Sequence, residues 1–286
     1  MKYFNVIGDI HGRRIWERLV CEDRINIFVG DYFDPYDRYD FEYLKENFLN
    51  IIKYADEHPG KVIMLLGNHD LHYFHFDDYS RLDESHVKEI QQLFLDNIDK
   101  FHGAAYAINN KVLVSHSGVT KPWLGSTDYF EGEKLLYNKR GQLTNEGDFH
   151  AKPLEDWINS LLWDGFTWHD DKPIGWEHWK ESGLRHFTFH EKCDYFDYYG
   201  TTKTQSPVWV RPTTLLEHNA MKDIEGSMQI VGHTQVFKII ATTHINDEKP
   251  RKIILVDCLG QDEPASLFVN LNEETDTCTY EVNLPH

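Results

Sequence analysis

Five short hydrophobic runs constrain the fold of this chain most, because each ends in glycine or serine followed by side chains able to bind a metal ion. The segments are VIGDIHG (6–12), IFVGD (27–31), VIMLLGNHD (62–70), VLVSHSG (112–118) and IVGHTQ (230–235). Each run is typical of a buried strand, and the carboxyl ends of strands in an open α/β sheet converge on one crevice. Carboxylates, imidazoles and one amide in that crevice suit a divalent ion such as Mn²⁺, Fe or Zn²⁺.

Strands and helices are expected to alternate through the first 120 residues. Apolar residues at helical spacing predict helices at Phe41 to Ala55 and Arg81 to Lys100, and a short helix is expected at Arg13 to Cys21. The expected strands are residues 3–7, Ile25 to Val29 and Val62 to Leu66, followed by a hairpin of Ala104 to Ile108 and Lys111 to Val114. This order predicts a layered α/β fold.

Regular patterning weakens between about residues 120 and 205, where aromatic, acidic and glycine residues are frequent. We interpret this segment as an irregular insertion over the crevice of a single domain, 1–286. Its aromatic side chains either pack the insertion, which we favour, or stack on a nucleobase or a phosphotyrosine. They are Trp157, Trp163, Trp168, Trp176, Trp179, Tyr195, Tyr198 and Tyr199.

Strands are expected again after the insertion. They are Val208 to Val210, Gln229 to Val231, Val236 to Ala241, Lys252 to Val256, Ser266 to Leu271 and Cys278 to Val282. The closing strands predict a second, mostly antiparallel sheet packed on the first.

Composition excludes several classes of protein. The formal net charge of −18 disfavours electrostatic binding to long nucleic acids or to anionic membranes. No run is apolar enough to span a membrane, and the chain enters its first strand directly, so we expect no signal peptide. The four cysteines are scattered without a CxxC pair, so we expect neither a disulfide framework nor a structural zinc site. This pattern favours a cytoplasmic location.

The five motifs resemble, in order and spacing, those of the calcineurin-like metallophosphoesterase superfamily, with its bacterial and phage phosphoprotein phosphatases nearest. They stand here as Gly8-Asp9-Ile10-His11-Gly12, Gly30-Asp31-Tyr32-Phe33-Asp34, Gly67-Asn68-His69-Asp70, Ser115-His116-Ser117-Gly118 and Gly232-His233-Thr234-Gln235. The resemblance covers about the first 120 residues and the region near 230. It implies a four-layer α/β/β/α sandwich of two mixed sheets and a phosphohydrolase with two divalent metal ions.

The resemblance also implies which side chains bind the two ions. The first ion takes Asp9, His11 and Asp31, and the second takes Asp31, Asn68, His116 and His233. Asp31 is suited to the shared position because a carboxylate has two oxygens and can bridge two ions. Gln235 stands where many relatives have a second histidine, so we do not expect it to be a ligand.

The expected catalytic side chains are His69, which would protonate the leaving oxygen, and Asp34, which would orient His69 and raise its pKa. His72 and His75 either support the metal ligands or contact the substrate, or they are solvated loop residues, which we favour. Phosphoprotein phosphatases continue after the second motif with Arg-Gly, but Pro35 follows Asp34 here.

Another arginine is therefore needed to bind phosphate through its planar fork of N–H groups. Arg211 is the main candidate, because the segment 206–212 resembles the arginine-bearing segment that bacterial and phage relatives place before the last metal-binding strand. Arg38 is the second candidate. An arginine that grips terminal phosphate oxygens favours phosphomonoesters as the substrate class.

These residues predict hydrolysis of a phosphomonoester by attack of a metal-bound hydroxide. The substrate would be a phosphorylated small molecule, a nucleotide or a phosphoprotein, and the expected ions are Mn²⁺, with Fe or Zn²⁺ as alternatives. A dinucleoside polyphosphate hydrolase or a phosphodiesterase is the alternative on the same scaffold. A metal-binding interaction module without turnover is the alternative from another class.

Overall fold

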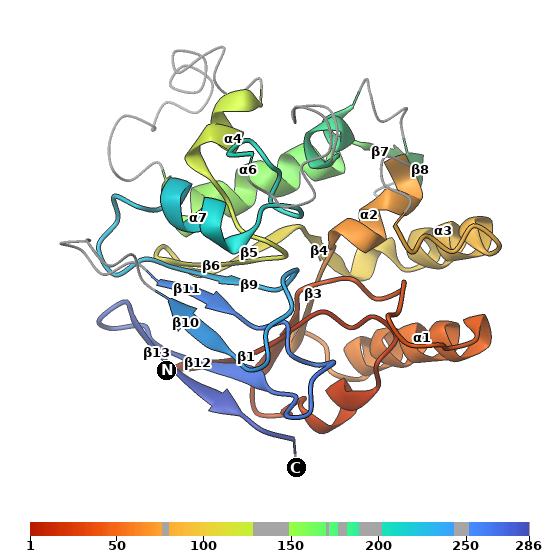
Figure 1. Cartoon of the computed structure of the whole chain (residues 1–286), viewed down its shortest axis with the longest axis horizontal. Coiled ribbons are helices and arrows are strands. Elements are labelled where there is room, and N and C mark those ends of the chain that lie inside the picture. The colour runs from red at the N-terminus through yellow and green to blue at the C-terminus, as the bar shows by residue number, and fades with distance from the viewer. Residues whose placement is uncertain are drawn as a thin grey trace.

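Two mixed β-sheets pack face to face between layers of helices (Figure 1). The computed structural model describes residues 1–75, 80–127, 149–169, 172–176, 182–188, 202–242 and 252–285. This architecture confirms the predicted α/β/β/α sandwich. None of the helices in these ranges has the length and apolar character needed to cross a bilayer.

The first sheet has the strand order β13-β12-β1-β2-β3-β4. Its strands are β1 (Lys2–Ile7), β2 (Ile25–Phe28), β3 (Val62–Leu65), β4 (Phe101–Gly103), β12 (Ser266–Asn272) and β13 (Thr277–Asn283). Neighbours from β1 to β4 are parallel, whereas β12 pairs antiparallel with both β1 and β13. The parallel strands place the loops after β1, β2 and β3 at one edge of the sheet.

The second sheet has the strand order β10-β11-β9-β6-β5. Its strands are β5 (Ala105–Asn109), β6 (Val112–Ser115), β9 (Met228–Val231), β10 (Ile240–Thr242) and β11 (Lys252–Leu255). Strands β6, β9 and β11 are parallel, while β5 and β10 pair antiparallel at the two edges. The expected hairpin is therefore confirmed as β5 and β6.

The core follows the alternation of side chains along each strand. Phe4 and Val6 of β1 belong to the cluster between the sheets, together with Val114 of β6 and Ile230 of β9. Ile7 belongs to the other core cluster, on the outer face of the first sheet. Successive residues of a strand face opposite sides, so one short apolar strand contributes to two layers of core.

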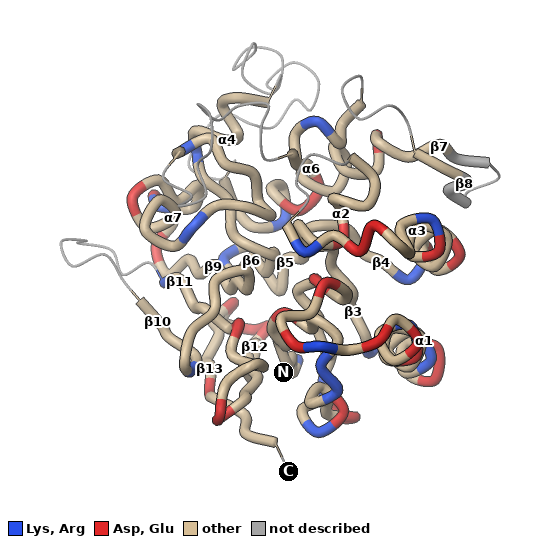
Figure 2. The backbone as a smooth tube through the Cα atoms, turned by 45° about the vertical axis from the view of Figure 1, so that its right-hand side comes forward, with Lys and Arg blue, Asp and Glu red and all other residues tan. Residues whose placement is uncertain are grey.

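Helices cover both outer faces (Figure 1). They are α1 (Phe41–Glu57), α2 (Asn68–His75), α3 (Val87–Asp96), α4 (Lys121–Ser126), α6 (Ala151–Trp163) and α7 (Pro212–His218). Helices α1 and α3 lie beside the first sheet, and α4, α6 and α7 lie over the second. Figure 2 shows acidic and basic positions interspersed along α1 and α3, which the Lys45–Glu89 ion pair joins at 2.5 Å.

Several predicted elements differ from the observed ones. The expected helix at Arg13 to Cys21 is a 3₁₀ helix at Ile15–Arg18, and Arg81 to Lys100 contains α3 and a 3₁₀ helix at Ile98–Lys100. Val208 to Val210 is not a strand but part of a turn region, in which Trp209 and Val210 donate backbone hydrogen bonds to Ser206. Of Val236 to Ala241, only the end contributes to β10.

We expected the closing strands to form one second sheet, but they divide between the two sheets. Strands β12 and β13 extend the first sheet, whereas β9, β10 and β11 join the hairpin in the second. The alternating residues Leu267, Val269 and Leu271 of β12 explain this, because they continue the core between the sheets beside Phe4 and Val6.

The segment at 120–205 is more regular than expected in its described part. Helix α6 buries Ala151, Leu154, Ile158 and Leu162 at helical spacing against the core of the second sheet. A hairpin, β7 (Phe166–His169) and β8 (Lys172–Trp176), and a 3₁₀ helix at Gly183–Phe187 follow. Residues 128–148, 170–171, 177–181 and 189–201 lie outside the described residues, and the division into a domain and an insertion stays a prediction.

The aromatic side chains at 120–205 are described only in part. Trp157, Trp163 and Trp176 pack against the core. Trp179, Tyr195, Tyr198 and Tyr199 lie outside the described residues, as does the side chain of Trp168. Stacking on a ligand therefore stays a prediction.

Candidate metal centre

All six predicted metal ligands lie in loops or at a helix start directly after a parallel strand. Asp9 and His11 follow β1, Asp31 follows β2, Asn68 begins α2 after β3, His116 follows β6, and His233 follows β9. Each side chain is at most 8% exposed. Several contacts link the two sheets here. Among them, the His233 backbone N–H lies 2.9 Å from Asp9 Oδ2, and His116 Nε2 lies 2.8 Å from Asn68 Oδ1.

Backbone strain is concentrated at this place. Six non-glycine residues in the described ranges have positive φ, and five of them lie here. They are His11 (44°), Asp31 (56°), Asp34 (56°), Arg81 (59°) and His233 (61°). A non-glycine residue in this region costs about 1–3 kcal/mol and persists only where the surrounding contacts fix it.

Two motif glycines allow the backbone to approach the carboxylates. A Cβ at Gly232 would lie 2.0 Å from Asp9 Oδ1, and a Cβ at Gly67 would lie 2.2 Å from Asp31 Oδ1. No side chain fits at either distance. Gly67, before Asn68, and Gly232, before His233, are therefore required by the carboxylates that pack on them.

Each imidazole donates its outward N–H to a backbone carbonyl. His11 Nδ1 lies 3.0 Å from the oxygen of Phe33, His116 Nδ1 lies 2.9 Å from that of Val29, and His233 Nε2 lies 3.1 Å from that of Trp209. Burial lowers the pKa of His116 to about 3 and holds the pKa of His11 and of His233 well below the usual value. The rings are therefore neutral, and the inward nitrogen of each carries a lone pair.

These bare nitrogens face oxygens that also carry lone pairs. His11 Nε2 and His116 Nε2 each lie 3.4 Å from Asp31 Oδ2. His233 Nδ1 lies 3.0 Å from Asn68 Oδ1. A rotated Asn68 amide would offer N–H groups to two rings, but Asp31, even when protonated, has one O–H and cannot donate to both His11 and His116. A cation among these atoms resolves the repulsion, and carbonyl-bound imidazoles are the usual arrangement of metal-binding histidines.

The carboxylates lead to the same conclusion. Burial and the mutual repulsion of Asp9, Asp31 and a third carboxylate, Asp257, raise the pKa of Asp9 well above its usual value. Burial likewise raises the pKa of Asp31. Ligand atoms of Asp9, Asp31 and His116 lie within 4.8 Å of one another. Divalent cations would neutralise this charge, so the residues present fit the metal ions that the sequence implies.

Asp257 is a component of the site that the sequence did not reveal. It follows β11, is 1% exposed, and neither of its carboxylate oxygens has a hydrogen-bond partner among the described residues. Burial raises its pKa to about 6. Asp257 lies outside the five motifs, so no spacing in the sequence pointed to it.

Asp70 joins the loop after β2 to the turn before α2. Its Oδ2 accepts hydrogen bonds from the backbone N–H groups of Asp31 and Gly67, each at 2.8 Å, and its Oδ1 accepts from Tyr32 at 2.9 Å. The side chain is fully buried. Asp70 therefore fixes the positive φ of Asp31 without facing the centre itself.

Replacing Asp70 with alanine is expected to lower the free energy of unfolding of metal-free protein by at least about 3 kcal/mol, because three buried N–H groups lose their acceptor at about 1–3 kcal/mol each. Urea unfolding of metal-free protein measures this, with the exposed Asp262→Ala as the matched control. A change within about 0.5 kcal/mol of the control, the usual range for surface substitutions, would show that Asp70 does not hold the two loops.

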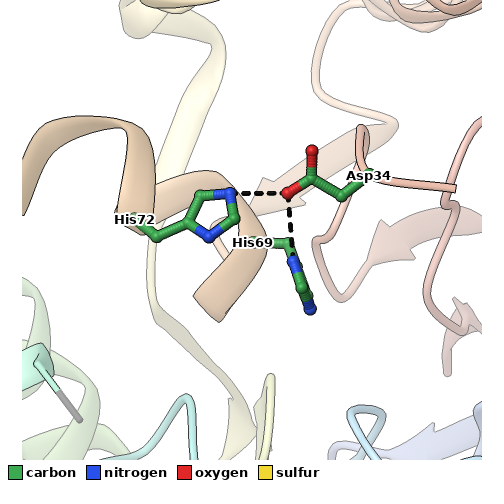
Figure 3. Close-up of side chains that lie close together, drawn as sticks. All are labelled: Asp34, His69 and His72. Atoms are coloured by element: carbon green, nitrogen blue, oxygen red, sulfur yellow. Dashed lines mark hydrogen bonds and ion pairs between the residues drawn. The ribbon is translucent and has the colours of Figure 1, made fainter. Parts of the chain in front are cut away.

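A second buried cluster contains Asp34, His69 and His72 (Figure 3), and the centre of the His69 ring lies 5.3 Å from that of the His11 ring. Asp34 Oδ2 lies 3.0 Å from His69 Nδ1 and 2.5 Å from His72 Nε2, and Oδ1 accepts from the Tyr73 hydroxyl at 2.5 Å. The rings reach Asp34 from the first turns of α2, because residues three and four apart share one helix face. These distances match a hydrogen-bond network that orients His69.

We expected His72 and His75 to be solvated loop residues, and this prediction was wrong. Both are fully buried in α2, at 0% and 1% exposure. The Gly67-Asn68-His69-Asp70 motif begins a helix, and this was missed because the residues after the motif are mostly polar or aromatic. The spacing of His69, His72 and Tyr73 was the signal that could have revealed it.

His69 is neutral in this structure. Burial lowers its pKa to about 4, although the hydrogen bond to Asp34 opposes the shift. Burial raises the pKa of Asp34, but hydrogen bonds from His69 and His72 outweigh it and leave the pKa below its usual value. The expected rise in the pKa of His69 is therefore not observed. Its Nδ1–H donates to Asp34, and its Nε2 carries a lone pair.

The arginines occupy different places around the centre. Arg211 Nη1 lies 3.1 Å from the carbonyl oxygen of His233, a predicted metal ligand, and 3.2 Å from Thr234 Oγ1. Arg38 is exposed. Arg81 was missed: its Nη2 lies 2.7 Å from His69 Nε2. Nothing in the sequence pointed to Arg81, because it is twelve residues beyond His69 and belongs to no motif.

Comparisons with known proteins give one family. The family described as calcineurin-like phosphoesterase matches residues 3–237. Similar solved structures include a cold-active protein-tyrosine phosphatase of a psychrophilic Shewanella species, at 15% identity and a TM-score of 0.42, covering 100% of this chain and 81% of that one. Another is a protein serine/threonine phosphatase from Saccharomyces cerevisiae, at 12% identity and a TM-score of 0.46, covering 99% and 79%. The search of curated proteins found no match.

Proposed function

The chain belongs to the calcineurin-like phosphoesterase family, and from this premise we propose that it is a phosphatase that hydrolyses phosphomonoesters with two divalent metal ions. The observation that carries the proposal is the set of neutral imidazoles whose bare nitrogens face Asp31 and Asn68. Phosphorylated small molecules, nucleotides and phosphoproteins are the proposed substrates. The net charge of −18 disfavours long nucleic acids.

We assign the ligands of the two ions as the motifs imply. The first ion would be held by Asp9, His11 and Asp31, and the second by Asp31, Asn68, His116 and His233. When bound, the ions would activate water for in-line attack and neutralise charge on the phosphoryl oxygens. Mn²⁺ is the proposed native ion, since the donor set combines carboxylates, an amide and imidazoles.

His69 and Asp34 are assigned to the departure of the leaving group. Asp34 fixes the His69 ring through Nδ1, so Nε2 is the atom that can donate a proton. The negative charge of a bound phosphate would favour the protonated ring. Arg211 would grip phosphate oxygens beside the second ion, and Arg38 stays the weaker candidate because its side chain is exposed.

Metal-stripped protein with and without added Mn²⁺ is the test, with p-nitrophenyl phosphate and bis-p-nitrophenyl phosphate as substrates. We expect metal-dependent hydrolysis that favours the monoester by at least about 10-fold, because a diester lacks one terminal oxygen for the arginine to bind, which costs about 1.4 kcal/mol or more. EDTA should abolish the activity, and Mn²⁺ should restore it.

Other results would select among the alternatives. A preference for the diester would reassign the protein as a phosphodiesterase. Hydrolysis of a dinucleoside polyphosphate alone would favour that class of hydrolase. Normal metal content without turnover of any of these would indicate a metal-binding interaction module. A cytoplasmic location stays a prediction.

A further inference from the structure

The guanidinium of Arg81 lies at the mouth of the site, on the atom assigned to meet the leaving group. Its Nη2 donates to His69 Nε2 at 2.7 Å, and its Nη1 donates to the carbonyl oxygen of Asp34 at 2.8 Å. The guanidinium carbon lies 3.7 Å from the centre of the Tyr36 ring. Tyr36 is half exposed, and Arg81 also reaches solvent. An arriving ligand would therefore meet this pair.

The two hydrogen-bond acceptors of Arg81 carry no charge. A neutral imidazole and a backbone carbonyl accept its two hydrogen bonds, and no carboxylate among the described residues lies within 4.0 Å of its guanidinium. Stacking on Tyr36 holds the plane of the fork, as a guanidinium on an aromatic face usually does. A guanidinium fork with no carboxylate in direct contact is suited to binding an anion.

The backbone conformation of Arg81 supports a functional role for its side chain. Arg81 has a φ of 59°, a conformation that it shares with His11, Asp31, Asp34 and His233 of the centre. Strain of this kind is retained where a side chain must be held in one place. Its hydrogen bond to the Asp34 carbonyl puts the fork directly beside Pro35, a residue that carries no charge.

We propose that Arg81 is a specificity-determining residue that binds the terminal oxygens of the substrate phosphate. This rests on the proposed phosphatase function. Without substrate, Nη2 donates to His69 Nε2 and occupies its lone pair. When phosphate arrives, the fork turns from His69 to two phosphoryl oxygens, which leaves Nε2 facing the ester oxygen. A monoester has three non-bridging oxygens, so one can face the metal-binding residues while two meet the fork. A diester has only two in all, so Arg81 selects monoesters.

The test compares Arg81→Ala, Arg81→Lys and the exposed control Arg18→Ala in Mn²⁺-loaded protein. Calorimetric titration with inorganic phosphate should show an affinity about 10- to 100-fold weaker in Arg81→Ala, the effect of losing charge-assisted hydrogen bonds. Lysine should restore little, because it lacks the fork. The kcat/KM for p-nitrophenyl phosphate should fall by a similar factor, and that for bis-p-nitrophenyl phosphate by less than about threefold.

Metal content and urea unfolding curves of each variant identify any loss of folding, and Arg81→Lys keeps the test valid if the alanine variant unfolds. Unchanged phosphate affinity in both Arg81 variants, or equal losses for the two esters, would overturn the inference while leaving the phosphatase function intact. Phosphate binding that depends on Arg81 in a protein that hydrolyses neither ester would support the anion site and contradict the proposed function.

Discussion

Asp31→Asn is expected to lose both metal ions and to lower turnover by at least about 1,000-fold, because stabilisation by the ions is worth several kcal/mol. Asp31 Oδ2 is the oxygen that both His11 and His116 face at 3.4 Å. An amide has one oxygen and no negative charge, so it cannot serve both ions. Elemental analysis of purified protein and p-nitrophenyl phosphate assays measure the two effects together.

The stability of the same variant separates a metal role from a structural one. Burial raises the pKa of Asp31, which means that the folded protein disfavours the charged carboxylate. Metal-free Asp31→Asn should therefore be at least as stable as metal-free wild type in urea at neutral pH, since an amide oxygen can still accept the His69 N–H that lies 2.9 Å from Oδ1. Asp262→Asn is the surface control. Normal occupancy of both metal sites in Asp31→Asn would contradict the bridging role.

The clustering of the six proposed ligands could be predicted because each of them is local to its strand. A short apolar run, a glycine and a polar residue specify both a buried strand and the polar loop at its carboxyl end, and parallel pairing then brings these loops together. Asp9 and His233 are 224 residues apart, yet both positions were evident because each closes such a run. The α/β/β/α layering results from the same alternation of strands and helices.

Features that depend on long-range packing were not predictable in this way. The sheet that β12 joins is decided by the core beside Phe4 and Val6, which no local pattern encodes. The unpartnered carboxylate of Asp257 and the fork of Arg81 come from segments without a motif. His72 and His75 were assigned to solvent because polar side chains usually face water, whereas the Asp34 carboxylate and the packing of α2 bury them.

His69→Asn is expected to lower kcat for phenyl phosphate by about 100- to 10,000-fold while leaving the metal content unchanged, because proton transfer from a positioned side chain contributes a factor of this size. The contact of His69 with Asp31 uses its backbone N–H, which asparagine retains, so the metal ligands keep their geometry. Kinetics on phenyl phosphate and elemental analysis measure the two quantities.

Two substrates whose leaving groups differ in basicity test the role of His69 as an acid directly. The p-nitrophenolate anion is a weaker base than phenolate and departs with less need of a proton, so His69→Asn should slow p-nitrophenyl phosphate less than phenyl phosphate. His218→Asn, on α7 and outside the site, is the control and should leave both rates unchanged. Because Asp34 holds His69 through Nδ1, Asp34→Asn should reproduce the pattern in weaker form. Equal losses on the two substrates would indicate that His69 positions the phosphate through Arg81 and is not the acid.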